Sequence, residues 1–226
     1  MPKAKVPRKD FPWGSNLAYA VGLITTDGNL SPNGRHISLT SSDKQLIFTF
    51  RRCLGKNNII SNNPPSSLSK KPSYRVQIGD VVLYDWLERI GLTPNKSLTI
   101  GKLKISNKYF RDFLRGHLDG DGSIIYYKDK YNTKLNPKYV YDRLFVYFRS
   151  ASANHITWLR NKISKIKGVH GSISTQKSKT QKGKSQEITL KFSTKEAKIL
   201  LNWIYYKPNL PCLKRKYWIA KPFLNQ

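Results

Sequence analysis

An internal repeat constrains the fold of this 226-residue chain more than any other feature. The stretches AVGLITTDGNL, at residues 20–30, and LRGHLDGDGSI, at residues 114–124, lie 94 residues apart. They match at four positions, which pair Gly22 with Gly116, Ile24 with Leu118, Asp27 with Asp121, and Gly28 with Gly122. A repeat of this length corresponds to a small domain. The chain is therefore expected to fold as two similar units.

The same order of elements is predicted after each motif: two strands, a helix, two more strands and a helix that contains tryptophan. The tryptophan helices are VVLYDWLERIGL, at 81–92, and AKILLNWIYY, at 197–206. A polar segment that contains Pro94 and Gly101 separates the repeats. We expect an N-terminal repeat over residues 1–104, with a linker at 93–104, and a C-terminal repeat over residues 105–226.

Alternation with a period of two predicts which face of each strand is buried. In RLFVYFR, residues 143–149, apolar side chains at 144, 146 and 148 alternate with cationic and aromatic ones. The segments EITLKFS at 187–193, YRVQI at 74–78 and HISLT at 36–40 alternate in the same way. An ordinary solvated sheet face is the alternative for any one strand. Several such faces that carry Lys and Arg but almost no acids favour a surface that binds a polyanion.

Composition points to the same partner. Forty-one Lys and Arg against 13 Asp and Glu give a net charge of +28, spread along the whole chain. A ribosomal protein would share this charge, but such chains are usually shorter and poorer in tryptophan. No apolar run approaches the roughly 18 residues needed to span a bilayer, so we expect no membrane association. Two cysteines are too few for a disulfide framework or a cysteine zinc site, which favours a reducing, intracellular compartment: a bacterial or archaeal cytoplasm, or an organelle.

Small residues on the two motif helices predict that these helices pack closely. Gly22 and Gly116 lie five residues before the motif acids and would let two backbones approach. Ala18 extends the small-residue strip of the first helix, whereas Asp112 occupies the equivalent position of the second. We therefore expect a helix pair with one polar end.

The motif acids predict a divalent-metal site. If the helices pair in parallel, Asp27 and Asp121 lie side by side at two negative helix ends, where only a cation would stabilise them. Mg²⁺ or Mn²⁺ held by two acids beside a basic sheet suits hydrolysis of a phosphodiester. An EF-hand loop is excluded, because Ile124 and Lys130 stand where Gly and Glu are required. A plain helix stop at Asp-Gly remains the alternative.

AVGLITTDG and LRGHLDGDG resemble the two motif copies of the LAGLIDADG homing endonucleases in their single-chain form. The resemblance implies an α+β fold in which two pseudo-symmetric αββαββα repeats form a saddle of two antiparallel sheets, with paired motif helices at the interface. It implies a monomer that cuts both strands of DNA with staggered ends. The sequence departs from the motif at Thr25, which replaces the earlier acid found as Asp119 in the second copy, and at His117, which replaces an apolar residue.

The resemblance also implies site residues. Asp27 and Asp121 would be the metal ligands, with help from the backbone carbonyls of Thr26 and Gly120. A basic or amide side chain on a strand near each site would orient water or stabilise developing charge, and the catalytic candidates are Lys191 and Gln77.

DNA contacts are expected from the polar sheet faces, from a tyrosine-rich and lysine-rich segment at 126–143, and from a Lys/Ser/Gln segment at 174–186. The partner would be double-stranded DNA with a long pseudo-palindromic or asymmetric site, and a mobile intron would encode the protein. The alternative is an RNA-splicing maturase of the same fold, which binds intron RNA. The DNA-binding candidates are Arg35, His36, Ser38, Thr40, Arg75, Gln77, Tyr126, Lys128, Lys130, Arg143, Tyr147, Arg149, Lys177, Lys179 and Lys191.

Overall fold

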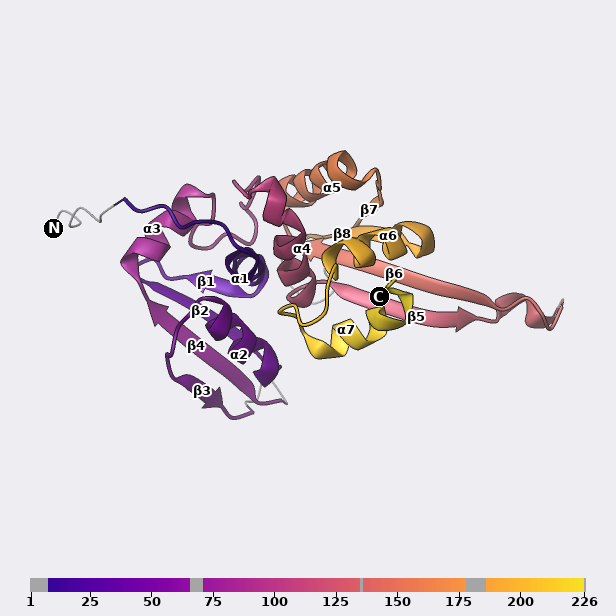
Figure 1. The fold of residues 1–226 in the computed structure, drawn as a ribbon, viewed down its shortest axis with the longest axis horizontal. Coiled ribbons are helices and arrows are strands. Elements are labelled where there is room, and N and C mark those ends of the chain that lie inside the picture. Colours follow the sequence, from indigo (N-terminus) through magenta and orange to yellow (C-terminus); the bar gives the residue numbers. More distant parts are fainter. Residues whose placement is uncertain (1–7, 66–70, 135, 178–185, 226) are drawn as a thin grey trace. The chain divides into compact units, whose positions relative to one another are not determined.

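The computed structural model describes residues 8–65, 71–134, 136–177 and 186–225. The chain divides into two compact units, residues 1–120 and 121–226, and each contains one four-stranded antiparallel sheet (Figure 1). The two sheets have the same strand order, β1-β2-β4-β3 and β5-β6-β8-β7. The α+β fold of two αββαββα repeats is therefore confirmed.

The first repeat contains every predicted element. It runs through α1 (Ser15–Thr26), β1 (Gly28–Leu30), β2 (His36–Ser41), α2 (Lys44–Cys53), β3 (Ile60–Asn63), β4 (Ser73–Gly79) and α3 (Val81–Arg89).

The second repeat has the same order and adds a short helix after it. It runs through the 3-10 turn η1 (Asn107–Tyr109), α4 (Phe110–Asp119), β5 (Ser123–Asp129), η2 (Tyr131–Lys134), β6 (Tyr141–Ser150), α5 (Ala153–Lys167), β7 (Ser172–Lys177), β8 (Gln186–Ser193), α6 (Thr194–Ile204), α7 (Lys214–Ala220) and η3 (Lys221–Phe223). Packing groups α4 with the first unit because α4 lies against α1. The boundary between residues 104 and 105 separates the two sequence repeats and not the two packed units, and it stays a prediction.

Helices cover one face of each sheet, as the alternation predicted. In the first sheet, Ile37 pairs with Ile78 and Leu39 with Val76, and all four side chains are buried. In the second sheet the same holds for the apolar positions of β6 and β8, onto which α5 and α6 pack. The long β5–β6 hairpin extends beyond these helices (Figure 1). None of the described helices packs on the opposite face of either sheet, and we call that face the outward face.

The backbones of α1 and α4 touch at their glycines. A Cβ added to Gly22 would lie 2.2 Å from the carbonyl oxygen of Phe113 and 2.9 Å from the Cα of Gly116. One added to Gly116 would lie 2.1 Å from the carbonyl oxygen of Tyr19. Real side chains do not come so close, so only glycine allows this approach. Ala18 is also buried in α1.

Buried polar groups surround this glycine contact. The hydroxyl of Tyr19 on α1 donates to Asp119 Oδ2 on α4 at 2.9 Å. Arg115 donates to Asp112 at 2.7 Å, and its guanidinium carbon lies 5.5 Å from the centre of the Tyr19 ring. Burial, and then the charge of Asp119, raise the pKa of Tyr19, which keeps its hydroxyl a donor. Asp112 therefore forms a paired polar end of the contact, as its position in the repeat suggested.

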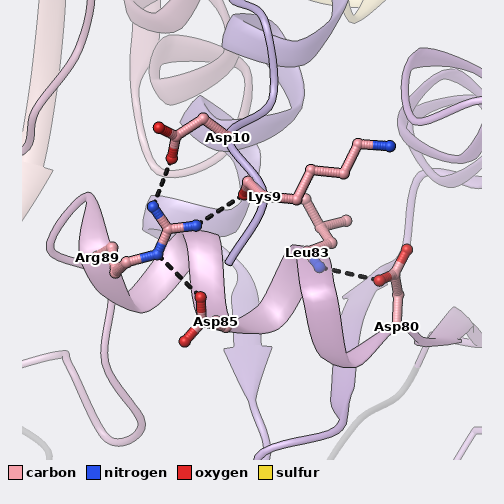
Figure 2. A network of polar contacts seen from close by, with 6 residues as sticks. All are labelled: Lys9, Asp10, Asp80, Leu83, Asp85 and Arg89. Carbon is pink, nitrogen blue, oxygen red and sulfur yellow. Dashed lines mark hydrogen bonds and ion pairs between the residues drawn. The ribbon is translucent and has the colours of Figure 1, made fainter. Parts of the chain in front are cut away.

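The segment before α1 is held along α3 (Figure 2). The Arg89 guanidinium donates to the carboxylate of Asp10, to the carbonyl of Lys9 at 2.7 Å, and to Asp85 at 2.9 Å. Trp13 packs against Trp86 of α3 with ring centres 5.1 Å apart. The basic N-terminal stretch is thus anchored to the first unit from residue 9 onward.

No helix in the described ranges has the length and apolar character needed to cross a bilayer. The buried thiol of Cys53 packs in the core at the end of α2, and burial raises its pKa to about 12. The thiol therefore stays protonated and unreactive at neutral pH.

Gly22→Ala is expected to lower the free energy of unfolding by about 3 kcal/mol or more, because the new Cβ meets backbone atoms that cannot move aside. Gly101→Ala is the matched control, since a Cβ there meets nothing within 4 Å. Urea unfolding followed by circular dichroism measures both variants. Equal stabilities of the two would contradict the close approach of α1 and α4.

Candidate functional site

Both motif acids follow the C-terminal end of a motif helix. Asp27 caps α1, and its N–H donates to the carbonyl of Leu23 at 3.0 Å. Gly120 caps α4 and donates to the carbonyl of Gly116 at 3.1 Å, and Asp121 is the next residue. A carboxylate at the negative end of a helix is destabilised unless a cation lies nearby.

Gly120 lies directly against the end of α1. A Cβ added to Gly120 would come within 1.9 Å of Thr26 Oγ1 and 3.1 Å of Asp27 Oδ2. The absence of a side chain at this position therefore lets the ends of the two motif helices meet around the Asp27 carboxylate. Thr26 Oγ1 and Asp27 Oδ2 thus lie together against Gly120, the residue immediately before Asp121 in the sequence.

These donors fit a hard divalent cation. Mg²⁺ and Mn²⁺ prefer carboxylate, carbonyl and water oxygens, whereas Zn²⁺ prefers nitrogen and sulfur. Within the ranges that the structure describes, no group of three or more His, Cys, Asp or Glu could hold a metal by itself. An ion at this site would thus need backbone, water or phosphate oxygens in addition to the motif acids.

In each repeat, a buried lysine donates a hydrogen bond to the backbone next to the motif acid. Lys96 donates to the carbonyl oxygen of Gly28, and Lys216 donates to that of Gly122 at 2.7 Å. Only 6% of Lys96 and 4% of Lys216 is exposed. Each glycine is the residue immediately after a motif acid. A buried ammonium needs polar partners, and in both repeats that partner is the backbone carbonyl of the residue after a motif acid.

The sequence pattern did not single out these lysines. Lys96 lies in the segment that was interpreted as a linker, and Lys216 lies in the unexpected helix α7. Lys96 lies 68 residues after its glycine partner, whereas Lys216 lies 94 residues after its own. The two lysines therefore do not occupy corresponding positions in the sequence repeat. Among the lysines that the structure describes, their burial sets them apart.

The catalytic candidates Gln77 and Lys191 occupy equivalent positions in the two sheets. Gln77 pairs with Ser38, which pairs with the residue two places after Asp27. Lys191 pairs with Tyr147, which pairs with the residue two places after Asp121. Gln77 accepts from Arg75 at 2.9 Å, and the Lys191 ammonium lies 4.2 Å from the centre of the Phe145 ring. Their catalytic role stays a prediction.

The structure brings most DNA-binding candidates onto the two outward faces. In the first sheet, Arg75 and Gln77 line a shallow pocket together with Asn57, Asn58, Ile59 and Ser61. Arg35 is exposed in the loop before β2, where its N–H donates to Asn33. The candidates on the outward faces, on the side opposite the core, are His36, Ser38, Thr40, Arg75 and Gln77 in the first sheet and Arg143, Tyr147, Arg149 and Lys191 in the second.

The remaining candidates lie elsewhere. Tyr126 pairs with the core residue Leu144, donates to Asp142 at 2.7 Å, and packs against the Phe223 ring at 5.0 Å. Lys128 shares that helix-side face of β5. Lys130 is exposed in the turn after β5. Lys177 ends β7, and Lys179 lies outside the described residues.

Asp119 and His117 belong to the helix contact. Asp119 is buried and accepts the hydrogen bond from Tyr19, and His117 is buried with its ring edge-on to Phe113. Asp119 thus joins α4 to α1, whereas the His117 ring packs within α4.

Comparison with known proteins agrees with this geometry. Residues 15–91 match the model of the LAGLIDADG-like domain. No curated protein is similar enough to count as a relative. Among solved structures, the I-LtrWI LAGLIDADG homing endonuclease bound to target DNA is 13% identical, with a TM-score of 0.56, over 92% of this chain and 89% of that one. Mesophilic variants of the homing endonuclease I-DmoI are 12% identical, with a TM-score of 0.56, over 92% of this chain and 97% of that one.

A different protein shares the fold to the same degree. Full-length DUF199/WhiA from Thermatoga maritima is 15% identical, with a TM-score of 0.55, over 94% of this chain, and this chain spans 63% of its length. Similarities this low show the fold alone. Residues 15–91 thus match the LAGLIDADG-like domain, and the whole chain has the two-repeat fold of the LAGLIDADG homing endonucleases.

Proposed function

We propose that this protein is a sequence-specific endonuclease that makes staggered, divalent-metal-dependent double-strand breaks in DNA. One observation carries the proposal. Each repeat holds an acid at the end of its motif helix and a buried lysine on the carbonyl of the next residue. A protein that only binds DNA gains nothing from two such carboxylates, which repel phosphate.

The chain's own residues suit this chemistry. A bound Mg²⁺ or Mn²⁺ would supply activated water and stabilise the leaving oxygen. Asp27 and Asp121 would hold the ion, with the carbonyls of Thr26 and Gly120. Lys96 and Lys216 fix the backbone after each acid, and each brings a positive charge toward the negative charge that develops on the phosphate.

The outward faces suit recognition of a long duplex site. Their cationic and hydroxyl side chains come from strands that a DNA groove can accommodate. I-LtrWI, which has this fold, was solved bound to target DNA. Since both repeats are in one chain, we propose that a monomer reads an asymmetric or pseudo-palindromic site and that a mobile intron encodes it.

One observation favours the alternative of a maturase that binds intron RNA. Tyr131, in the turn of the β5–β6 hairpin, is 89% exposed, and Tyr139 and Tyr141 stack on each other nearby. Exposed rings of this kind can stack on unpaired bases. The shared fold of DUF199/WhiA also shows that similarity of fold does not by itself imply cleavage.

Asp27→Asn and Asp121→Asn should each abolish double-strand cleavage while leaving DNA binding intact or tighter, because asparagine removes the metal ligand and its repulsion of phosphate. Excess EDTA should have the same effect on the unchanged protein. Cleavage of a target duplex with Mg²⁺ and a gel shift without it measure both properties. Glu88→Gln, at an exposed site on α3, is the control for loss of one negative charge. If either Asp variant cleaved at the wild-type rate, that acid would only end its helix and would have no catalytic role.

Lys216→Met should slow cleavage about 100-fold, since removal of one charge-stabilising donor commonly has an effect of this size. If each lysine serves one strand, nicked plasmid should accumulate before linear product. Lys214→Met is the matched control, because Lys214 is exposed in the same helix. If both variants cut alike, Lys216 has only a structural role.

Binding should weaken steeply with salt, because each phosphate neutralised by Lys or Arg contributes a slope of about −0.9 in log K against log salt concentration. Arg75→Ala should reduce this slope if Arg75 contacts phosphate, and should relax preference at one base pair if it reads a base edge. Fluorescence anisotropy titrations at several salt concentrations measure the slope. A slope near zero would mean that the outward faces do not bind the duplex.

A further inference from the structure

The outward faces of the two sheets differ in chemistry. The central row of the first sheet consists of Asn29, Ser38 and Gln77, all hydrogen-bonding residues. The face of the second sheet presents Ile125 and Tyr127 on β5 beside Phe145 and Tyr147 on β6. Because these strands occupy the same places in the two sheets, Tyr147 corresponds to Ser38 and Phe145 to His36, so the difference lies in the side chains and not in the fold.

Tyr127, Phe145 and Tyr147 form one aromatic cluster. The ring centres of Tyr127 and Phe145 are 6.2 Å apart, and those of Phe145 and Tyr147 are 6.1 Å apart. Ile125 pairs with Phe145 in the β-ladder and is 42% exposed, and Tyr127 is 48% exposed. Burial, and then the proximity of Tyr127, raise the pKa of Tyr147, so the Tyr147 hydroxyl stays protonated at neutral pH.

Two cationic side chains lie next to the rings of this cluster. The Lys191 ammonium lies 4.2 Å from the centre of the Phe145 ring, and the Arg149 guanidinium lies 5.9 Å from that of Tyr147. The two acids on the same face are each paired with an arginine, Asp129 with Arg143 and Glu187 with Arg149. An apolar patch within a cationic surface fits an anionic partner that offers an apolar group.

The thymine methyl group provides such an apolar group in duplex DNA, because it projects from the base edge into the major groove. Stacking on unpaired bases is less suited to this patch, since the Lys191 ammonium already occupies one face of the Phe145 ring and a base would have to displace it. The ring edges and Ile125 are the parts available to a methyl group.

We infer that the aromatic cluster Tyr127, Phe145 and Tyr147 recognises thymine by its methyl group in the half-site bound by the second sheet, whereas the first sheet reads its half-site by hydrogen bonds. This inference rests on the proposed recognition of duplex DNA. It assigns different chemistry to the two halves of the target, with apolar discrimination in one of them.

Replacement of thymine by uracil tests the inference, because it removes the methyl group and leaves base pairing unchanged. A preferred duplex is first selected from a random library with the full protein in EDTA. The half-site whose specificity relaxes in Arg75→Ala is assigned to the first sheet. Uracil is then introduced into each half-site separately, and Kd is measured by fluorescence anisotropy.

Uracil in the second half-site should weaken binding about fourfold for each buried thymine methyl group that it removes, and uracil in the first half-site should have little effect. Phe145→Ser should bind the thymine and uracil duplexes alike, whereas Phe145→Leu should keep part of the difference. Ile199→Ser is the matched control, since Ile199 is an apolar side chain 45% exposed on α6, on the helix side of the sheet. It should keep the full difference.

Two results would overturn the inference. If a duplex is selected but uracil in the second half-site leaves Kd unchanged, the cluster does not read methyl groups, although recognition of duplex DNA stands. If no duplex sequence is selected and a single-stranded or intron RNA binds in a Phe145-dependent way, both the inference and the proposed function fail.

Discussion

The contact between the backbones of α1 and α4 is the constraint on which the rest of the structure depends. Because Gly22 and Gly116 meet without side chains between them, the two helices have one possible depth of contact. The Tyr19 to Asp119 hydrogen bond then selects their register, since a shift along the axis would leave a buried hydroxyl and a buried carboxylate without each other. This register brings Gly120 against Asp27. The position of Gly120 beside Asp27 is thus set by the glycine contact and by the Tyr19 to Asp119 hydrogen bond.

The end of a motif helix is an unfavourable place for a carboxylate, and a lysine from the end of each repeat lies on the backbone next to it. A carboxylate at the end of a helix is opposed by the helix dipole. Lys96, which follows the last helix of the first repeat, and Lys216, which follows the last repeat helix of the second, return to the start of their own units and bind the backbone beside the acid. The end of each repeat is therefore tied to its first strand, which links the integrity of the fold to the charge balance at the site.

Sequence predicted the parts of the molecule that depend on local order. The glycines and acids of the motif, the αββαββα order and the buried faces of β2, β4, β6 and β8 all follow from spacing and alternation, which the backbone imposes directly. Residues whose role depends on distant partners were not predictable in this way. Lys96 and Lys216 each donate a hydrogen bond to a carbonyl that lies 68 or 94 residues away in the sequence. Tyr126 was expected to contact DNA because of its place in the tyrosine-rich segment, but the strand pleat turns it to the helix side, where its ring packs against Phe223.

Under the proposed function, the duplication within the chain separates the residues that would serve cleavage from those that would serve recognition. Each repeat carries an acid after its motif helix, a glycine after the acid and a buried lysine that donates to that glycine's carbonyl. These three features are common to both halves. At equivalent positions of the outward faces the halves differ: Ser38 corresponds to Tyr147, and Gln77 to Lys191. Two strands of a duplex present the same phosphodiester to be broken but different base sequences to be read. Sameness around the acids and divergence across the sheets are what a protein that cuts both strands of an asymmetric site requires.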